Sequence, residues 1–121
     1  MRNPDRVKQA KNVNSKLLQL IEVKRSLIHG RGVFARTTIR KGARIGTYEG
    51  EVTLRDGTHV LWVPMENGKY LGVHGKNELR YMNHSSRPTA EVDGIEVYAR
   101  KTIKPGTEVT FHYGDEWEDV D

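Results

Sequence analysis

Residues 34–42, Phe-Ala-Arg-Thr-Thr-Ile-Arg-Lys-Gly, recur 64 positions later as residues 98–106, Tyr-Ala-Arg-Lys-Thr-Ile-Lys-Pro-Gly. When residues 34–51 are compared with residues 98–115, six of 18 positions are identical and four more are conservative. Each copy has the pattern of a strand, a turn that contains glycine, and a second strand, and Pro105 fixes φ before the glycine of the second turn. We therefore expect two similar β units that pack as related halves. Two unrelated turns that use the same turn-forming residues would, however, give the same pattern.

The residues around these two units predict a mostly β domain with little helix. Short runs rich in β-branched and aromatic residues are separated by breakers that contain glycine. Asp56-Gly57, Asn67-Gly68 and Asp93-Gly94 favour hairpin turns, because Asn, Asp and Gly tolerate positive φ. One short helix is expected over residues 77–82, and strands are expected over residues 17–24, 32–35, 45–52, 60–63, 70–73, 90–92, 96–99 and 109–113.

Length and composition exclude several classes of protein. A chain of 121 residues indicates one domain with a modest core. The absence of cysteine excludes disulfides, thiolate zinc sites, iron–sulfur clusters and a cysteine nucleophile. The apolar stretches are too short to span a bilayer, and the first residues lack the apolar region of a secretory signal. We therefore expect an intracellular protein, cytoplasmic or nuclear, with no membrane contact.

Charge is distributed unevenly along the chain. The net charge is +5 over residues 1–25 and −5 over residues 114–121. We interpret residues 1–15 as a flexible basic arm and residues 16–121 as one domain that ends in an acidic tail, residues 114–121. The arm could bind nucleic acid weakly and the tail could attract a basic partner, but two solvated ends are the simpler interpretation. Many short strand edges also leave homodimerisation open.

Four segments of the chain form a specific set of motifs. They begin at Ser26-Leu-Ile-His-Gly-Arg-Gly, Ile39-Arg-Lys-Gly, Glu78-Leu-Arg-Tyr-Met-Asn-His-Ser and Glu108-Val-Thr-Phe-His-Tyr-Gly, and together they span about residues 20–115. In this order they resemble the SET domain of protein lysine methyltransferases. The most specific part is Arg80 to Ser85, followed by the segment from Glu108 to Gly114. The resemblance implies small curved sheets and a pseudoknot in which the C-terminal segment threads through a loop of the chain.

The resemblance also implies a reaction and the residues that perform it. It implies methyl transfer from S-adenosylmethionine to the ε-amine of lysine in a basic protein, which could be histone-like, ribosomal or DNA-associated. Tyr113 would be the catalytic residue, and Tyr48, Phe111 and Trp117 would shape the lysine channel. The cofactor would contact His29, Gly30, Arg31, Gly32, Asn83, His84 and Tyr113. No metal is expected, because the histidines lack ligand spacing and there is no cysteine.

Some positions refine this interpretation. Phe111, in place of tyrosine, favours dimethylation or trimethylation, and Trp62 is expected in the core. Ser86 occupies the place of a family cysteine that joins a zinc module, and Thr89 stands where asparagine is usual. Residues 53–77 form a short insert that is typical of one hairpin. The alternative function is a catalytically silent SET-like module held on nucleic acid or on a protein partner by the basic arm.

Overall fold

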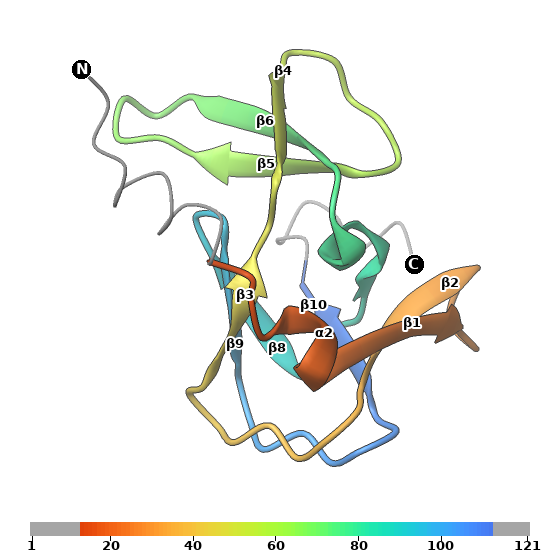
Figure 1. The fold of residues 1–121 in the computed structure, drawn as a ribbon. Helices are drawn as coiled ribbons and strands as arrows, with labels where there is room; N and C mark the ends of the chain where they lie inside the picture. The colour runs from red at the N-terminus through yellow and green to blue at the C-terminus, as the bar shows by residue number, and fades with distance from the viewer. Residues whose placement is uncertain (1–12, 113–121) are drawn as a thin grey trace.

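The computed structural model describes residues 13–112 and arranges them in three small β-sheets (Figure 1). The first sheet has the order β1 (Ile21–Arg25), β2 (Arg31–Ala35), β10 (Glu108–Phe111) and β7 (Asn83–His84). The second has the order β3 (Arg44–Thr47), β9 (Glu96–Ala99) and β8 (Ala90–Asp93). The third has the order β4 (Gly50–Thr53), β6 (Tyr70–Gly75) and β5 (Val60–Pro64). Two single-turn helices, α2 (Leu17–Leu20) and the 3-10 helix η1 (Glu78–Tyr81), complete the fold.

Strand β10 lies in the middle of the first sheet and joins segments that are far apart in sequence. It pairs antiparallel with β2, where Val109 is opposite Val33. On its other side it pairs parallel with β7, where Phe111 is opposite His84. Segments from the beginning, the middle and the end of the described chain therefore lie side by side. The threading of the C-terminal segment through a loop stays a prediction.

The two repeated turns are held together by a reciprocal pair of backbone hydrogen bonds. Ile39 donates its N–H to the carbonyl of Ile103 at 2.8 Å, and Ile103 donates to the carbonyl of Ile39 at 2.7 Å. The flanking bonds are also related: Gly42 donates to Ala99, and Gly106 donates to Ala35, both at 2.8 Å. The two donors, Gly42 and Gly106, are 64 positions apart, and so are the two acceptors, Ala35 and Ala99. This arrangement confirms that the two similar units pack as related halves.

Glycine closes each of these turns because the backbone there is left-handed. Gly42 and Gly106 both have φ of +85°, a region that side chains with a Cβ rarely adopt. Nothing lies within 4 Å of the position that a Cβ would occupy at either residue, so the conformation and not crowding requires glycine.

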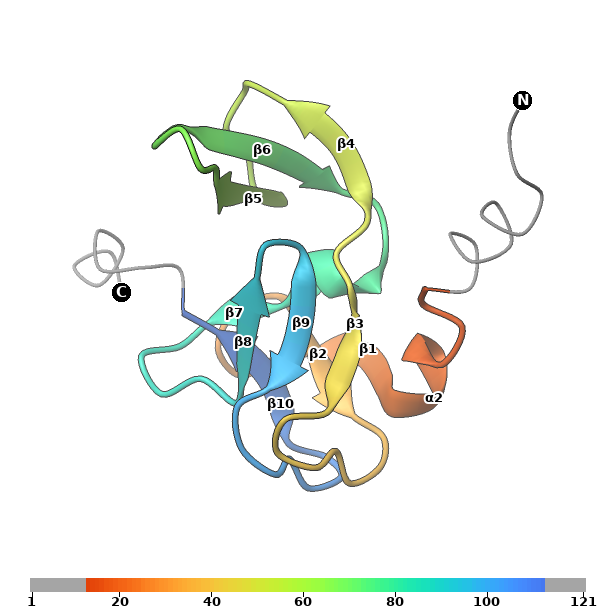
Figure 2. The same ribbon diagram turned by 90° about the vertical axis from the view of Figure 1, so that its left-hand side faces the viewer.

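The core lies mainly between the first two sheets and η1. Its largest fully buried side chains come from all of these elements and from the paired turns: Ile21, Val33, Ile45, Leu79, Val97, Ile103 and Val109. The third sheet, which stands apart at the top of both views (Figures 1 and 2), contributes Val73 as its buried hydrophobic side chain. On its outer strand and the following loop, Val52 and Leu54 are exposed. The third sheet is therefore anchored more lightly than the rest.

Some expected elements differ from the observed ones. Residues 17–24 do not form one strand, because Leu17–Leu20 form a helical turn with Leu17 buried and Leu18 exposed before β1 begins. Residues 45–52 are divided at Tyr48 and Glu49, because β3 pairs with β9 whereas β4 pairs with β6 in another sheet. The helix expected over residues 77–82 is present as the short 3-10 helix η1.

Two of the three predicted hairpin turns are confirmed. Asn67-Gly68 joins β5 to β6 and Asp93-Gly94 joins β8 to β9, each with its glycine at positive φ. The prediction of a hairpin turn at Asp56-Gly57 was wrong. Strand β4 pairs with β6, and the loop after β4 crosses to the far side of β6, where β5 lies. Residues 53–77 do contain the expected hairpin, β5–β6.

Trp62 is not a core residue, contrary to expectation. It is only partly buried, and its indole N–H donates to the Asp56 carboxylate at 3.0 Å. This bond, together with a bond from the backbone N–H of Gly57, lowers the pKa of Asp56. Trp62 thus ties the loop before β5 to the third sheet. Within the described residues, no helix is long and apolar enough to cross a membrane.

The paired turns predict the effect of core truncation. Ile39→Ala and Ile103→Ala should each lower the free energy of unfolding by about 2–5 kcal/mol, because each removes a fully packed side chain and leaves a cavity. Urea denaturation measures the change. Leu54→Ala, at an 85% exposed position, is the control and should change stability by about 0.5 kcal/mol or less. A loss below about 1 kcal/mol for either isoleucine variant would contradict the importance of this junction.

Candidate functional site

Asn83, at the start of β7, connects three parts of the chain. Its amide nitrogen donates to the carbonyls of His29 at 3.1 Å and Arg31 at 3.2 Å. The same nitrogen donates to Oε2 of Glu108 at 2.8 Å. The loop between β1 and β2 is thereby fixed against β7 and β10. His29, Gly30, Arg31, Gly32 and Asn83, all predicted from sequence as one group, are brought together here.

Glu108 occupies the space in which a side chain at residue 32 would lie. Its carboxylate accepts the Ser26 hydroxyl at 2.7 Å as well as the Asn83 amide, and it lies directly over Gly32. A Cβ at Gly32 would be 2.4 Å from Oε2, so the carboxylate would have to move and give up its bonds to Ser26 and Asn83. Gly30 serves a different purpose, because its φ is +43° and nothing lies within 4 Å of its Cβ position. Sequence reasoning had not singled out Glu108 for this role.

The donors of Asn83 are committed inside the protein, and this fixes the orientation of its amide. Three acceptors surround Nδ2, so the amide oxygen must occupy the other position. Within residues 13–112 no hydrogen bond is made to that oxygen. A surface hollow of about 490 Å³ opens beside the same loop and is lined by Arg25, Ser26, Gly30 and Arg31. Asn83 is therefore an acceptor, and not a donor, toward a ligand at this place.

Tyr48 and Phe111, both predicted for the substrate channel, line one small cavity. Its volume is about 20 Å³, close to the space that one water molecule needs. The Tyr48 hydroxyl donates to the carbonyl of His59, and the ring lies so close to Gly75 that a Cβ there would be 2.7 Å from Cζ. Apolar side chains form much of the remaining wall, including Leu61, Leu79 and Met82.

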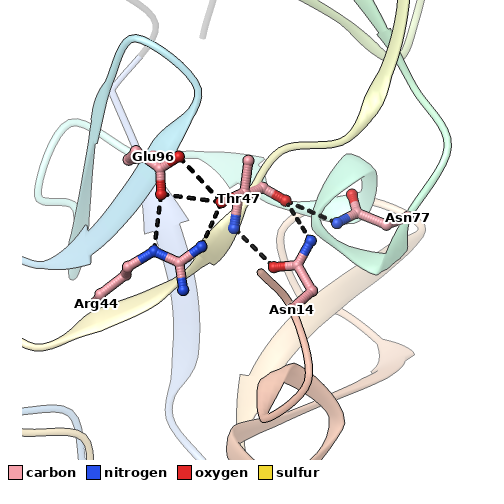
Figure 3. Close-up of polar contacts among 5 residues, drawn as sticks. All are labelled: Asn14, Arg44, Thr47, Asn77 and Glu96. Carbon is pink, nitrogen blue, oxygen red and sulfur yellow. Dashed lines mark hydrogen bonds and ion pairs between the residues drawn. The ribbon is translucent and has the colours of Figure 1, made fainter. Parts of the chain in front are cut away.

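A polar network holds the chain just before Tyr48 (Figure 3). The side-chain amide of Asn14 exchanges two hydrogen bonds with the backbone of Thr47, accepting its N–H at 2.7 Å and donating to its carbonyl at 3.0 Å. Asn77 donates to the same carbonyl at 2.8 Å. The Thr47 hydroxyl bonds to Glu96, which also pairs with Arg44 at 2.7 Å. The end of β3, and with it Tyr48, is thus positioned by residues from three other segments of the chain: Asn14, Asn77 and Glu96.

Asn14 places part of the predicted arm against the domain. It lies inside residues 1–15, the predicted arm, yet its side chain makes the pair of bonds to Thr47. Residues 1–12 lie outside the described residues, so the flexibility of the arm stays a prediction. Neither Asn14 nor Asn77 carries a motif, because an amide that bonds to a distant backbone leaves no pattern in the sequence.

His59 is a member of the cavity wall that sequence reasoning missed. Its ring nitrogen Nδ1 is 3.0 Å from the carbonyl of Arg80, and its ring meets Tyr81 edge to face at 5.4 Å. The guanidinium of Arg80 also contacts the Tyr81 ring and lies 4.3 Å from its centroid. Arg80 also donates to the carbonyls of Lys76 and Asn77, so its side chain has a structural role.

Some of the remaining residues singled out from sequence lie within the described part of the chain, and others lie outside it. His84 lies in β7, and its ring meets that of His112 at 4.9 Å. Thr89, where an amide is usual in the family, uses its hydroxyl to donate to the carbonyl of Glu108 and to accept the N–H of Thr110. Tyr113 and Trp117 lie outside the described residues, and their predicted roles stay predictions. Among residues 13–112 no group of side chains could hold a metal ion.

Residues 30–114 match the SET domain family, and the chain belongs to that family. Two curated relatives, from Mus musculus and Homo sapiens, are each named histone-lysine N-methyltransferase, H3 lysine-36 specific. Each is 29% identical over 115 residues, an alignment that covers 77% of this chain and 4% of the relative. The chain thus spans only a small part of the length of these relatives.

Solved structures agree with the family in fold. The methyltransferase domain of human histone-lysine N-methyltransferase SETMAR superposes with a TM-score of 0.68 at 21% identity, covering 83% of this chain and 46% of that one. The methyltransferase domain of human PR domain-containing protein 2 superposes with a TM-score of 0.66 at 20% identity, covering 86% and 83%. The expected SET-like fold of small sheets is therefore confirmed.

The Glu108 cluster predicts coupled losses of stability. Glu108→Ala should cost about 1–3 kcal/mol of unfolding free energy, because the Ser26 hydroxyl and the Asn83 amide lose their acceptor. Adding Ser26→Ala to that variant should cost much less than Ser26→Ala does alone. Chemical denaturation of the four proteins measures the coupling. Glu91→Ala, at an exposed position on β8, is the control, and fully additive losses would contradict the proposed cluster.

Proposed function

We propose that this chain is a protein-lysine N-methyltransferase that uses S-adenosylmethionine. Membership of the SET domain family supports the proposal, as does the arrangement of the residues that the resemblance assigned to the cofactor. The observation that carries it is the locked amide of Asn83, which offers an acceptor beside the loop from His29 to Gly32. A cavity with Tyr48 and Phe111 in its wall accompanies it.

The site offers both a carboxylate, Glu108, and the arginines Arg25 and Arg31, which suits a cofactor that has a sulfonium, an amine and a carboxylate group. When bound, S-adenosylmethionine supplies a methyl group that its sulfonium has already activated, so the protein has mainly to position the reactants and exclude water. Asn83 Oδ1 can accept a bond from an ammonium group. Glu108, whose Oε2 lies 2.8 Å from the Asn83 amide nitrogen, adds negative charge to this region. The residues present therefore fit the cofactor.

The acceptor in the reaction is a lysine amine, which must lose a proton before it can attack. Its ordinary pKa is near 10.4, and an adjacent positive charge and a desolvating channel both disfavour the ammonium form. The cavity that Tyr48 and Phe111 line is small, so a lysine amine beside it would be largely shielded from water. Tyr113, two residues beyond Phe111, would orient the amine through its hydroxyl. This scheme requires neither a carboxylate base nor a metal ion.

The substrate that we propose is a basic, lysine-rich protein inside the cell. The curated relatives are named for a histone lysine, which makes a histone-like tail the first candidate. The acidic residues 114–121 would attract such a segment electrostatically. Ribosomal and DNA-associated proteins have the same chemistry and belong in the same test.

Binding and transfer can be tested separately. Asn83→Ala should weaken S-adenosylmethionine binding by about 10- to 100-fold in calorimetry, because a hydrogen bond to a charged group contributes about 1.5–3 kcal/mol. Ser86→Ala, at an exposed neighbouring position, is the matched control and should bind normally. Tyr113→Phe removes one hydroxyl and leaves the other proposed cofactor contacts in place, so it should still bind the cofactor but lose transfer of labelled methyl to a panel of basic proteins.

The outcomes distinguish the functions. Absence of cofactor binding by the unmodified chain would contradict both the enzyme and the cofactor assignment. Cofactor binding without transfer to any basic protein would favour the catalytically silent binding module.

The cavity makes a prediction about the degree of methylation. We expect dimethyl- or trimethyl-lysine from the unmodified enzyme and mainly monomethyl-lysine from Phe111→Tyr. An added hydroxyl, or a water bound to it, would fill a space of only about 20 Å³ and leave less room for methyl groups. Mass spectrometry of the product measures the ratio. Monomethylation by both proteins would refute the role of Phe111.

A further inference from the structure

The pairing of the two repeated turns gathers a cluster of positive charge at one end of the molecule. Residues 35–43 and 99–107 together contain six Lys or Arg residues and no Asp or Glu. The bonds between Ile39 and Ile103 hold these segments side by side, and both lie at the bottom of Figures 1 and 2. Five of these six basic residues are grouped here under the name basic end, and all five are exposed: Arg40, Lys41, Arg100, Lys101 and Lys104.

These five charges are not used to stabilise the described fold. None of their side chains makes an ion pair or a hydrogen bond with residues 13–112. The sixth cation, Arg36, behaves differently: it lies 3.9 Å from a carboxylate oxygen of Glu22 and donates to the carbonyl of Ile21 at 3.1 Å. Five like charges therefore stay close together without local compensation, although their mutual repulsion disfavours the arrangement.

The other side chains of the basic end narrow the kind of partner. Thr37, Thr38 and Thr102 are exposed, and hydroxyl groups with Lys and Arg are the usual ligands of nucleic-acid phosphates. The large apolar side chains of the two turns, Ile39 and Ile103, are buried. The basic end thus lacks an aromatic platform for stacking unpaired bases and an apolar patch for a protein partner.

We propose that the basic end binds the phosphate backbone of duplex DNA without reading its sequence. The basic end lies away from the candidate site, so DNA could bind there while a substrate reaches the cavity. The two turns precede β3 and β10, whereas Tyr48 follows β3 and Phe111 ends β10. DNA at the basic end would therefore leave the cavity at the other end of these strands open. This inference goes beyond the proposed methyl transfer and does not depend on it.

Salt dependence tests the proposal directly. The full chain should bind a fluorescent mixed-sequence duplex of about 20 base pairs, measured by anisotropy between about 50 and 200 mM salt. Each phosphate neutralised contributes about −0.9 to the slope of log K against log salt, so three to five contacts predict a slope of about −3 to −4.5. A slope near zero, or tighter binding to single-stranded DNA of the same length, would overturn the proposal.

Charge-matched variants locate the surface. Lys101→Gln with Lys104→Gln should make the slope less steep by about 1.8 and weaken binding about tenfold or more at 0.1 M salt. Arg55→Gln with Lys69→Gln removes the same charge from exposed positions in the loop after β4 and in the β5–β6 turn. That control should bind DNA as the unmodified chain does. Equal losses from both pairs would show that only net charge matters and would overturn the proposal.

Two further comparisons separate binding at the basic end from binding by the N-terminal segment and from binding of an acidic protein. The effect of Lys101→Gln with Lys104→Gln should persist after Arg2→Gln, Arg6→Gln and Lys8→Gln neutralise residues of the N-terminal segment. If those three changes alone abolish binding, the N-terminal segment and not the basic end binds DNA. Polyglutamate should compete poorly with the duplex, and equal competition would indicate an acidic protein partner instead. Unchanged thermal unfolding of the variants would show that lost binding is not lost folding.

Discussion

The pair of hydrogen bonds between Ile39 and Ile103 is the constraint on which the arrangement of the sheets depends. Strands β2 and β9 lead into the two turns, and β3 and β10 lead out of them, so one junction sets four strands in two different sheets. The side chains of both isoleucines are buried, and Gly42 and Gly106 close the turns in the same left-handed conformation. Strands β3 and β10 both leave this junction, and Tyr48 directly follows β3 whereas Phe111 ends β10. These two residues line the same cavity.

Much of this architecture could be predicted, because the repeat, the glycine turns and the β-rich runs are local signals. The parts that were missed depend on partners distant in sequence. Strand β7 has two residues and exists because β10 pairs with it, so no propensity marks it. The run from 45 to 52 has the composition of one strand, and only the competition between β9 and β6 for its two halves divides it. Asp56-Gly57 has hairpin chemistry, but β6 takes the place beside β4 that β5 would need.

The residues of the candidate site likewise include some that the sequence indicated and some that it could not. Family motifs pointed to Gly32 and Asn83, and the structure supplies a physical reason in Glu108, which occupies the space above one and orients the other. His59, Asn14 and Asn77 could not be found from sequence. Each acts through a backbone or ring contact whose partner lies 21 to 33 positions away, and such a contact leaves no periodicity or spacing to detect.

Glu108 also changes how the glycine-rich loop is understood. A Gly-x-Gly turn suggests that a ligand approaches the backbone at both glycines, yet at Gly32 the group that approaches is the protein's own carboxylate. That carboxylate takes up the donors of Ser26 and Asn83 and leaves an amide oxygen and a negative charge beside the loop. The hollow beside this carboxylate is also lined by Arg25 and Arg31, so the loop offers charges of both signs to a ligand. S-adenosylmethionine also carries both signs, with positive charges on the sulfonium and the amine and a negative charge on the carboxylate. Glu108 would therefore contribute to specificity by orienting the Asn83 amide, without having to touch the cofactor itself.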